Sequence, residues 1–210
     1  MNVHSIRAIE TPLGRMVAVA SERGLTSLGW SDARENDCTT GQNHIEDTKV
    51  WVRAFFEHRS APPPELDRSG LTAFQDKVLG TLSEVAPFGG VVSYGGLASA
   101  SGSSDASRAV GSVRAGTPWA LLVPCHRVVR SDGRVGNYSG CEGGTSKMWL
   151  LGHEGNRFDS DQRVIRQSSR PVNDVIQNFN QRFRRSRLRV VGEVDSVEQP
   201  HPYCHFRLVP

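Results

Sequence analysis

The chain has 210 residues, of which 37% are hydrophobic and 22% charged, and its formal net charge is +3. This length and composition suit one compact domain or two small ones with an ordinary buried core. No apolar run is long enough to span a membrane and the N-terminus carries no secretory leader, so we expect neither a membrane protein nor a secreted one.

The cysteine pattern argues against a disulfide framework and against a metal centre. Cys38, Cys125, Cys141 and Cys204 are irregularly spaced and form no CxxC pair, which is typical of free thiols in a reducing compartment. Neither these cysteines nor the N-terminal histidines have the spacing of zinc ligands, so the sequence predicts no metal.

The N-terminal region predicts a small antiparallel sheet. Apolar stretches alternate with turn residues such as Pro12, Gly14 and Gly24, and this pattern is typical of short strands joined by tight turns. The expected strands of this β-meander are residues 5–10, 16–20 and 25–30.

A helix and a linker are expected after the strands. Residues 31–47 are polar and aperiodic, and we expect a loop there. The apolar residues between Val50 and Phe55 have helical spacing, which predicts a helix over 49–57 with one apolar face. A proline run at 60–64 predicts a linker. We expect this whole region to be a supporting domain without chemistry.

Three helices are predicted next. Residues 72–85 have an apolar face at Phe74, Val78 and Leu82, and the proline and glycines of 87–90 end this helix. Two shorter helices follow at 94–101 and from about 105 to 115, with Ser93 and then Ser104 or Asp105 as N-caps. Two short helices joined by a glycine-containing turn are typical of a helix-turn-helix, although a hairpin that only packs gives the same pattern.

A cysteine motif follows the helices. The apolar run 121–123 leads through Pro124 to Cys125, with His126 and Arg127 directly after it. Pro124 favours an extended residue before it, so we expect a buried strand that ends at a pocket wall and presents Cys125. A thiol is a good nucleophile only as the thiolate, and His126 could promote ionisation through a bridging water. A buried structural cysteine fits the short motif equally well.

A loop and a last helix complete this part of the chain. A turn at 131–133 leads into a glycine-containing loop at 135–140, which can bring backbone N–H groups against a planar ligand. The helix through Trp149 ends at Glu154. A carboxylate at a helix C-terminus is unfavourable to the helix dipole, which favours a special role for Glu154 over an ordinary helix-end carboxylate.

Five motifs follow one another along the chain, at 88–98, 107–111, 124–128 (Pro-Cys-His-Arg-Val), 133–140 and 147–155. Together they resemble the O6-alkylguanine-DNA alkyltransferases, also named methylated-DNA–protein-cysteine methyltransferases. The resemblance is close over residues 71–158 and loose over residues 3–66.

The resemblance implies an α/β (α+β) fold. Residues 1–66 would form a ribonuclease H-like domain of a small β-sheet with a helix. Residues 67–158 would form a winged-helix-like active-site domain whose helix-turn-helix enters the minor groove, and residues 159–210 a basic tail, partly disordered or with one short helix. The protein would reside in the nucleus of a eukaryote and otherwise in the cytoplasm.

The resemblance also implies DNA repair by direct reversal. The alkyl group of O6-methylguanine in duplex DNA, with O4-methylthymine as a further candidate, would move to Cys125 in one stoichiometric turn. No cofactor is needed because the damaged base carries the group transferred. Glu154 would orient His126, His126 would deprotonate Cys125 through water, and Tyr94 would help to rotate the nucleotide and donate to the base. We expect a monomer with double-stranded lesion DNA as its partner.

The resemblance assigns further residues to DNA. Arg108 would fill the hole left by the flipped nucleotide, with a solvated arginine as the alternative, and Tyr94 could equally be an aromatic packed between helices. The base pocket would include the carbonyl of Val128 and the side chains of Tyr138 and Ser139. Other expected contacts to DNA or to the base are Ala109, Arg114, Arg127 and Asn137.

Two features depart from the family pattern. Thr117 precedes Pro118 where the family has an asparagine that pins the recognition helix to the active-site turn, so the coupling between them is open. The segment 141–146 makes the loop before Lys147 longer than usual and brings a second thiol, Cys141, near the pocket.

Other functions remain to be weighed. A non-catalytic lesion-binding relative would lack the cysteine, so Cys125 argues against it, whereas Thr117 keeps a weakly active variant open. A cysteine hydrolase would need an oxyanion hole and a distant histidine, and the sequence indicates neither.

The tail carries a helical pattern and a basic stretch. Its apolar residues from Val175 to Phe183 have helical spacing, and five arginines fall within 182–189. This stretch is either a solvated tail or an electrostatic arm on DNA phosphates.

Overall fold

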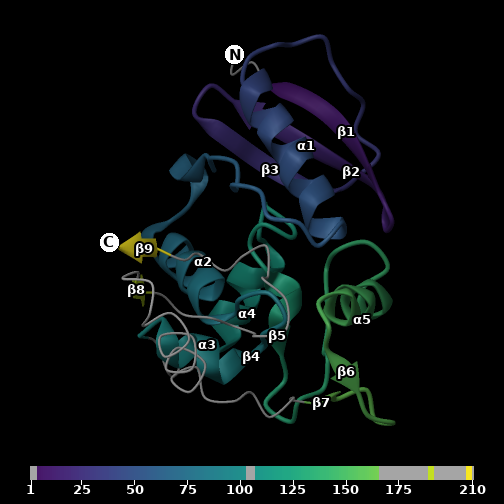
Figure 1. Cartoon of the computed structure of the whole chain (residues 1–210), viewed down its shortest axis with the longest axis vertical. Helices are drawn as coiled ribbons and strands as arrows, with labels where there is room; N and C mark the ends of the chain where they lie inside the picture. Colours follow the sequence, from purple (N-terminus) through teal and green to yellow (C-terminus); the bar gives the residue numbers. More distant parts are fainter. Residues whose placement is uncertain (1–3, 103–106, 166–188, 192–206, 210) are drawn as a thin grey trace.

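The computed structural model describes residues 4–102, 107–165, 189–191 and 207–209. A three-stranded sheet with helix α1 lies at one end of the molecule, and the helices α2 to α5 lie at the other (Figure 1). Within this part of the chain, no helix is both long enough and apolar enough to cross a membrane.

The N-terminal sheet confirms the predicted β-meander. It contains β1 (Ser5–Thr11), β2 (Gly14–Ser21) and β3 (Gly24–Trp30), antiparallel and in the order β1-β2-β3. Gly24 opens β3 with φ of 147°, and a Cβ there would lie 2.7 Å from the carbonyl oxygen of Glu65. Only glycine therefore fits this turn.

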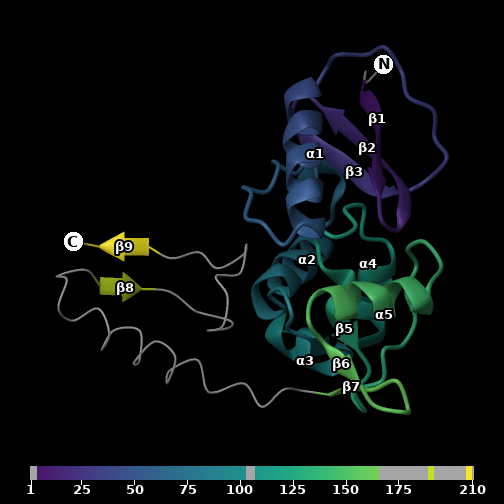
Figure 2. The same cartoon turned by 45° about the vertical axis from the view of Figure 1, so that its right-hand side comes forward.

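Helix α1 (Gln42–Phe56) begins earlier than the predicted start at residue 49, so the expected loop over 31–47 was too long. It lies along one face of the sheet (Figure 2). Its first turns bury the polar Thr48, whose hydroxyl donates to the His44 carbonyl at 2.6 Å. Because a polar residue takes a buried position there, the helical spacing of apolar residues is not visible in this part of the sequence. Val50, expected on the apolar face, is 59% exposed.

The two helices of the predicted helix-turn-helix are confirmed, whereas residues 103–106, with the predicted caps Ser104 and Asp105, lie outside the described residues. Helix α2 (Ala73–Val85) starts with a capping box between Thr72 and Gln75. Ser93 caps α3 (Tyr94–Ala100), since its hydroxyl accepts from the Gly96 N–H at 3.0 Å. Helix α4 (Ser107–Ala115) packs against α3. Phe74, expected to face the core, is 36% exposed at the start of α2.

The remaining elements are short, apart from helix α5 (Gly144–His153). The strands β4 and β5 form a parallel pair, and β6–β7 and β8–β9 form antiparallel pairs. The helix expected near 175–183 and most of the arginine-rich stretch lie outside the described residues. The bounds are η1 (Arg68–Gly70), β4 (Val92–Ser93), η2 (Cys125–Arg127), β5 (Val128–Val129), β6 (Arg157–Phe158), β7 (Val164–Ile165), β8 (Arg189–Val191) and β9 (Arg207–Val209).

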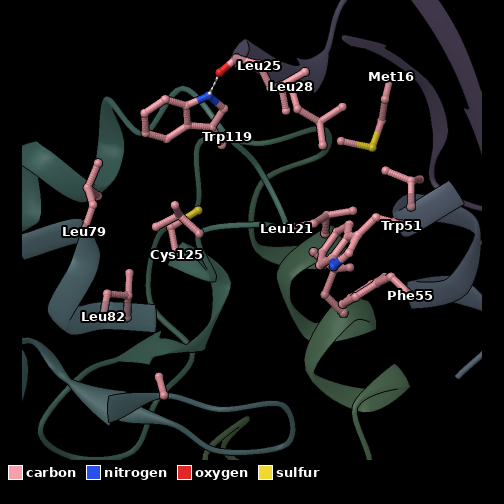
Figure 3. Close-up of a cluster of buried hydrophobic side chains, with 14 of the residues drawn as sticks. Met16, Leu25, Leu28, Trp51, Phe55, Leu79, Leu82, Trp119, Leu121 and Cys125 are labelled. Carbon is pink, nitrogen blue, oxygen red and sulfur yellow. Dashed lines mark hydrogen bonds between the residues drawn. The ribbon is translucent and has the colours of Figure 1, made fainter. Parts of the chain in front are cut away.

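Strand β3 joins the two halves of the molecule. Its outer edge pairs with Leu66 through Leu25 and with Trp119 through Leu28. The Trp119 indole N–H also donates to the Leu25 carbonyl at 2.7 Å (Figure 3). One apolar cluster includes side chains from the sheet, α1, α2 and Cys125, so the active-site segment shares its core with the N-terminal sheet.

Candidate active site

Turns, and not the expected strand, carry the chain into Cys125. Pairing with β3 stops at Ala120, because Leu121 enters the left-handed region with φ of 70° and turns the chain away. Pro124 then forms an inverse γ-turn, in which the Cys125 N–H donates to the Val123 carbonyl at 2.7 Å. The 3-10 helix η2 begins at the cysteine itself.

Cys125 lies in apolar surroundings. It is 4% exposed and belongs to the same apolar cluster as Leu79, Leu82 and Trp119 (Figure 3). A thiol is a good nucleophile only as the thiolate. A nucleophilic role for this thiol therefore requires a base close by.

His126 is a neutral base held by Glu154. Its Nε2 lies 2.7 Å from Glu154 Oε1, and both side chains are fully buried. Because the carboxylate accepts, Nε2 carries the proton and Nδ1 presents a lone pair. Nδ1 is buried, with no hydrogen-bond partner among the described residues, so it is free to take up a proton.

Arg127 binds the same carboxylate, and its expected contact to DNA or to the base stays a prediction. Its Nε donates to Glu154 Oε2 at 2.9 Å and its Nη2 to Oε1 at 2.9 Å. Its Nη1 donates to the Ala86 carbonyl at 2.7 Å. The side chain is 7% exposed, and the guanidinium lies 5.5 Å from the centre of the Phe88 ring. All of its donating groups therefore point into the protein.

The charges of this cluster keep Glu154 ionised and His126 neutral. Burial alone would raise the pKa of Glu154, but the Arg127 guanidinium and His126 outweigh it and hold that pKa well below its usual range. Burial lowers the pKa of His126, and Arg127 and Lys147 add to this effect against the opposing charge of Glu154.

Tyr94 and the predicted DNA-contacting residues lie around the helix pair. The parallel pairing of β4 with β5 sets Tyr94, the first residue of α3, beside the strand that follows η2. Its ring packs against α4, since a Cβ at Gly111 would lie 3.7 Å from it. Arg108 and Ala109 are exposed on α4, and Arg114 lies farther along the same helix.

The loop at 135–140 turns alternate side chains outward. Asn137 and Ser139 are exposed, whereas Tyr138 between them is 8% exposed. The Tyr138 ring meets the Trp30 ring of the N-terminal sheet edge to face, with centroids 6.5 Å apart.

Lys147 is a site residue without a predicted role. Its ammonium group is fully buried and donates to the carbonyls of Val128, at 2.5 Å, and of Val135. The Asn137 carbonyl lies 3.4 Å away. Lys147 has helical spacing to Leu151 and Glu154, which both point inward, and this spacing was the signal that could have revealed it.

Thr117 shows no hydrogen bond to the active-site turn. Its Oγ1 is buried without a partner among the described residues. The turn is held by β3 through Trp119 and Ala120.

Comparisons with a family model, with curated proteins and with solved structures all match the same family. The family model for the DNA-binding domain of 6-O-methylguanine DNA methyltransferase matches residues 73–156. The methylated-DNA–protein-cysteine methyltransferase of Homo sapiens is 37% identical over 167 residues, which cover 71% of this chain and 80% of that protein. The Methanosarcina barkeri protein of the same name is 32% identical and covers 71% of this chain and 96% of its own length. The structure of Mycobacterium tuberculosis OGT in complex with DNA matches with 30% identity and a TM-score of 0.58, over 71% of this chain and 91% of that one.

Proposed function

The chain belongs to the methylated-DNA–protein-cysteine methyltransferase family of DNA repair enzymes, and from this we propose that Cys125 accepts the alkyl group of O6-alkylguanine in double-stranded DNA in one irreversible turn. As a member it binds DNA and acts as an O6-methylguanine methyltransferase. The observation that supports the assignment to Cys125 is the buried hydrogen bond between His126, the next residue in the chain, and Glu154.

In the proposed reaction, His126 Nδ1 takes the Cys125 proton through a bridging water, and Glu154 stabilises the imidazolium that results. The thiolate attacks the alkyl carbon. The S–C bond forms as the C–O6 bond breaks, and the electron pair leaves with guanine, which takes a proton from Tyr94; the proton on His126 then returns to Tyr94 through solvent. Since the product is a stable thioether and removing its alkyl group would need a further nucleophile to displace the thiolate, each molecule acts once.

For the lesion, we propose that α4 enters the minor groove and that Arg108 occupies the space left by the flipped nucleotide. The exposed position of Arg108 at the start of α4 supports this. Ser139, Asn137 and the Val128 carbonyl then line the base pocket, with Tyr138 behind them. The protein acts as a monomer and needs no cofactor.

The test is the mass of the intact protein after incubation with duplex DNA that contains O6-methylguanine. We expect one added methyl group, mapped by peptide analysis to Cys125. Cys125→Ala should lose the transfer and keep DNA binding, whereas Cys141→Ala, the matched control, should retain both. A methyl group on Cys38, Cys141 or Cys204 would overturn the assignment, and DNA binding without any transfer would point to a lesion-binding protein.

A further inference from the structure

The base-pocket loop lies against the N-terminal sheet. Trp30, the last residue of β3, meets the Tyr138 ring at an interplanar angle of 76°. Gly140 lies between the two rings, since a Cβ there would come within 2.8 Å of the Tyr138 ring and 3.0 Å of the Trp30 ring. No side chain fits at this position without moving one of the rings, so the loop is tightly held.

A second contact joins the same loop to the sheet. The Cys141 sulfur lies 3.3 Å from the carbonyl oxygen of Leu13, in the turn between β1 and β2. Lys147 binds the carbonyls of Val135 and Asn137 in the same loop. The loop is therefore fixed between a buried ammonium group of the C-terminal half and two residues of the N-terminal half.

We propose that Trp30 is a positioning residue for the flipped base. It holds Tyr138, and through Tyr138 it sets the place of the neighbouring Asn137 and Ser139, which face outward. The N-terminal sheet thus takes part in substrate recognition beyond mere support. This inference rests on the proposed function, because it assumes that the loop forms a wall of the base pocket.

The effect should appear in binding of the base and not in the chemical step. Trp30 contacts the loop, whereas Cys125, His126 and Glu154 lie on η2 and at the end of α5. An edge-to-face aromatic pair corresponds to roughly a two- to ten-fold change in affinity. Trp30→Ala should therefore raise the half-saturating concentration of free O6-benzylguanine by this factor, with the limiting alkylation rate unchanged.

The experiment measures Cys125 alkylation against the concentration of O6-benzylguanine in the full chain. Trp30→Phe keeps a ring and should restore most of the affinity. Gly140→Ala, which pushes the two rings apart, should raise the half-saturating concentration as Trp30→Ala does. The matched control is Phe56→Ala, which removes a partly buried N-terminal aromatic that contacts Trp149 and His153 instead of the loop.

An unchanged half-saturating concentration in Trp30→Ala and Gly140→Ala would overturn the proposal. So would an equal rise in Phe56→Ala, because that would indicate a general loosening between the two halves. If Trp30→Ala does not fold, Trp30→Phe and Gly140→Ala decide the question. A wild-type protein that O6-benzylguanine does not alkylate would instead contradict the proposed function itself.

Discussion

At the scale of single residues, one carboxylate organises the site. Glu154 accepts from His126, from Arg127 and from the Gly89 N–H, the last at 3.3 Å. Its charge is balanced by the arginine, and burial keeps the histidine beside it neutral by lowering its pKa. The carboxylate is thus a structural and an electrostatic part of the site at once.

Removing this charge should destabilise the fold. Glu154→Gln leaves the Arg127 guanidinium buried without its counterion, and breaking a buried pair in this way costs about 3–5 kcal/mol. Urea unfolding at neutral pH measures the loss. Glu84→Gln, at an exposed position on α2, is the matched control and should change stability little. Equal effects of the two substitutions would show that the buried pair contributes nothing.

The fall of the alkylation rate at acid pH should begin below the ordinary pKa of histidine. Because burial lowers the pKa of His126, the neutral base persists as the pH falls to about 6.5. The alkylation rate with O6-benzylguanine should therefore decline only below that pH. Since the unfolded chain takes up this proton more readily, stability should also fall as the pH drops through the same value. An acid limb centred above 6.5 would mean that Glu154 dominates over burial.

Thr117 offers a substitution that should stabilise the protein. Its buried hydroxyl has no partner among the described residues, and such a group costs about 1–3 kcal/mol. Thr117→Val replaces it with a methyl group and should raise the free energy of unfolding by about 1 kcal/mol. The control is Thr48→Val, which removes a hydroxyl that is hydrogen-bonded and should lower stability. A loss in both variants would show that Thr117 has a partner.

At the scale of elements, local signals predicted the regular structure well. The strands of the meander and the starts of α2 and α3 follow from turn and cap residues such as Gly24, Thr72 and Ser93, which act on their immediate neighbours. Of the residues that carried the resemblance, His126 and Glu154 lie in hydrogen-bond contact, and the catalytic role of Cys125 stays a prediction.

Errors arose where distant contacts decide the structure. The approach to Cys125 was predicted as a strand, but its pairing partner is β3, almost a hundred residues away, and Leu121 ends that pairing. The ion pair that buries Arg127 against Glu154 also joins residues that lie 27 positions apart. Neither contact has a local signature in the sequence.

Helix α4 should matter for duplex DNA and not for the free base. Arg108→Ala leaves the flipped nucleotide without a substitute in the stack, and because flipping costs a few kcal/mol, repair of duplex DNA should slow about ten-fold or more. The rate with O6-benzylguanine should stay near that of the wild type. Arg59→Ala, an exposed arginine after α1, should affect neither substrate. Equal losses on both substrates would show that Arg108 is structural.

At the scale of the whole molecule, the two halves share one apolar cluster. Leu28 is 1% exposed, and its backbone pairs with that of Trp119 across the junction. A continuous core of this kind makes the halves depend on each other for stability.

The described halves should therefore unfold together. Tryptophan fluorescence and far-ultraviolet circular dichroism should report the same urea midpoint, as in a two-state transition. Leu28→Ala should lower the free energy of unfolding by about 2–5 kcal/mol and keep the two midpoints equal. Two separate transitions, with only one of them moved by Leu28→Ala, would contradict a shared core.

The hydrogen bond from Trp119 to Leu25 also has a consequence for synthesis. The two residues are 94 positions apart, and a ribosome that adds about 5–20 residues each second needs roughly 5–20 s to cover that stretch. Until then the outer edge of β3 near Leu28 lacks its partner, and an unpaired strand edge is prone to pair with other chains. The nascent protein should therefore depend most on chaperones during this interval, before residues 117–125 emerge.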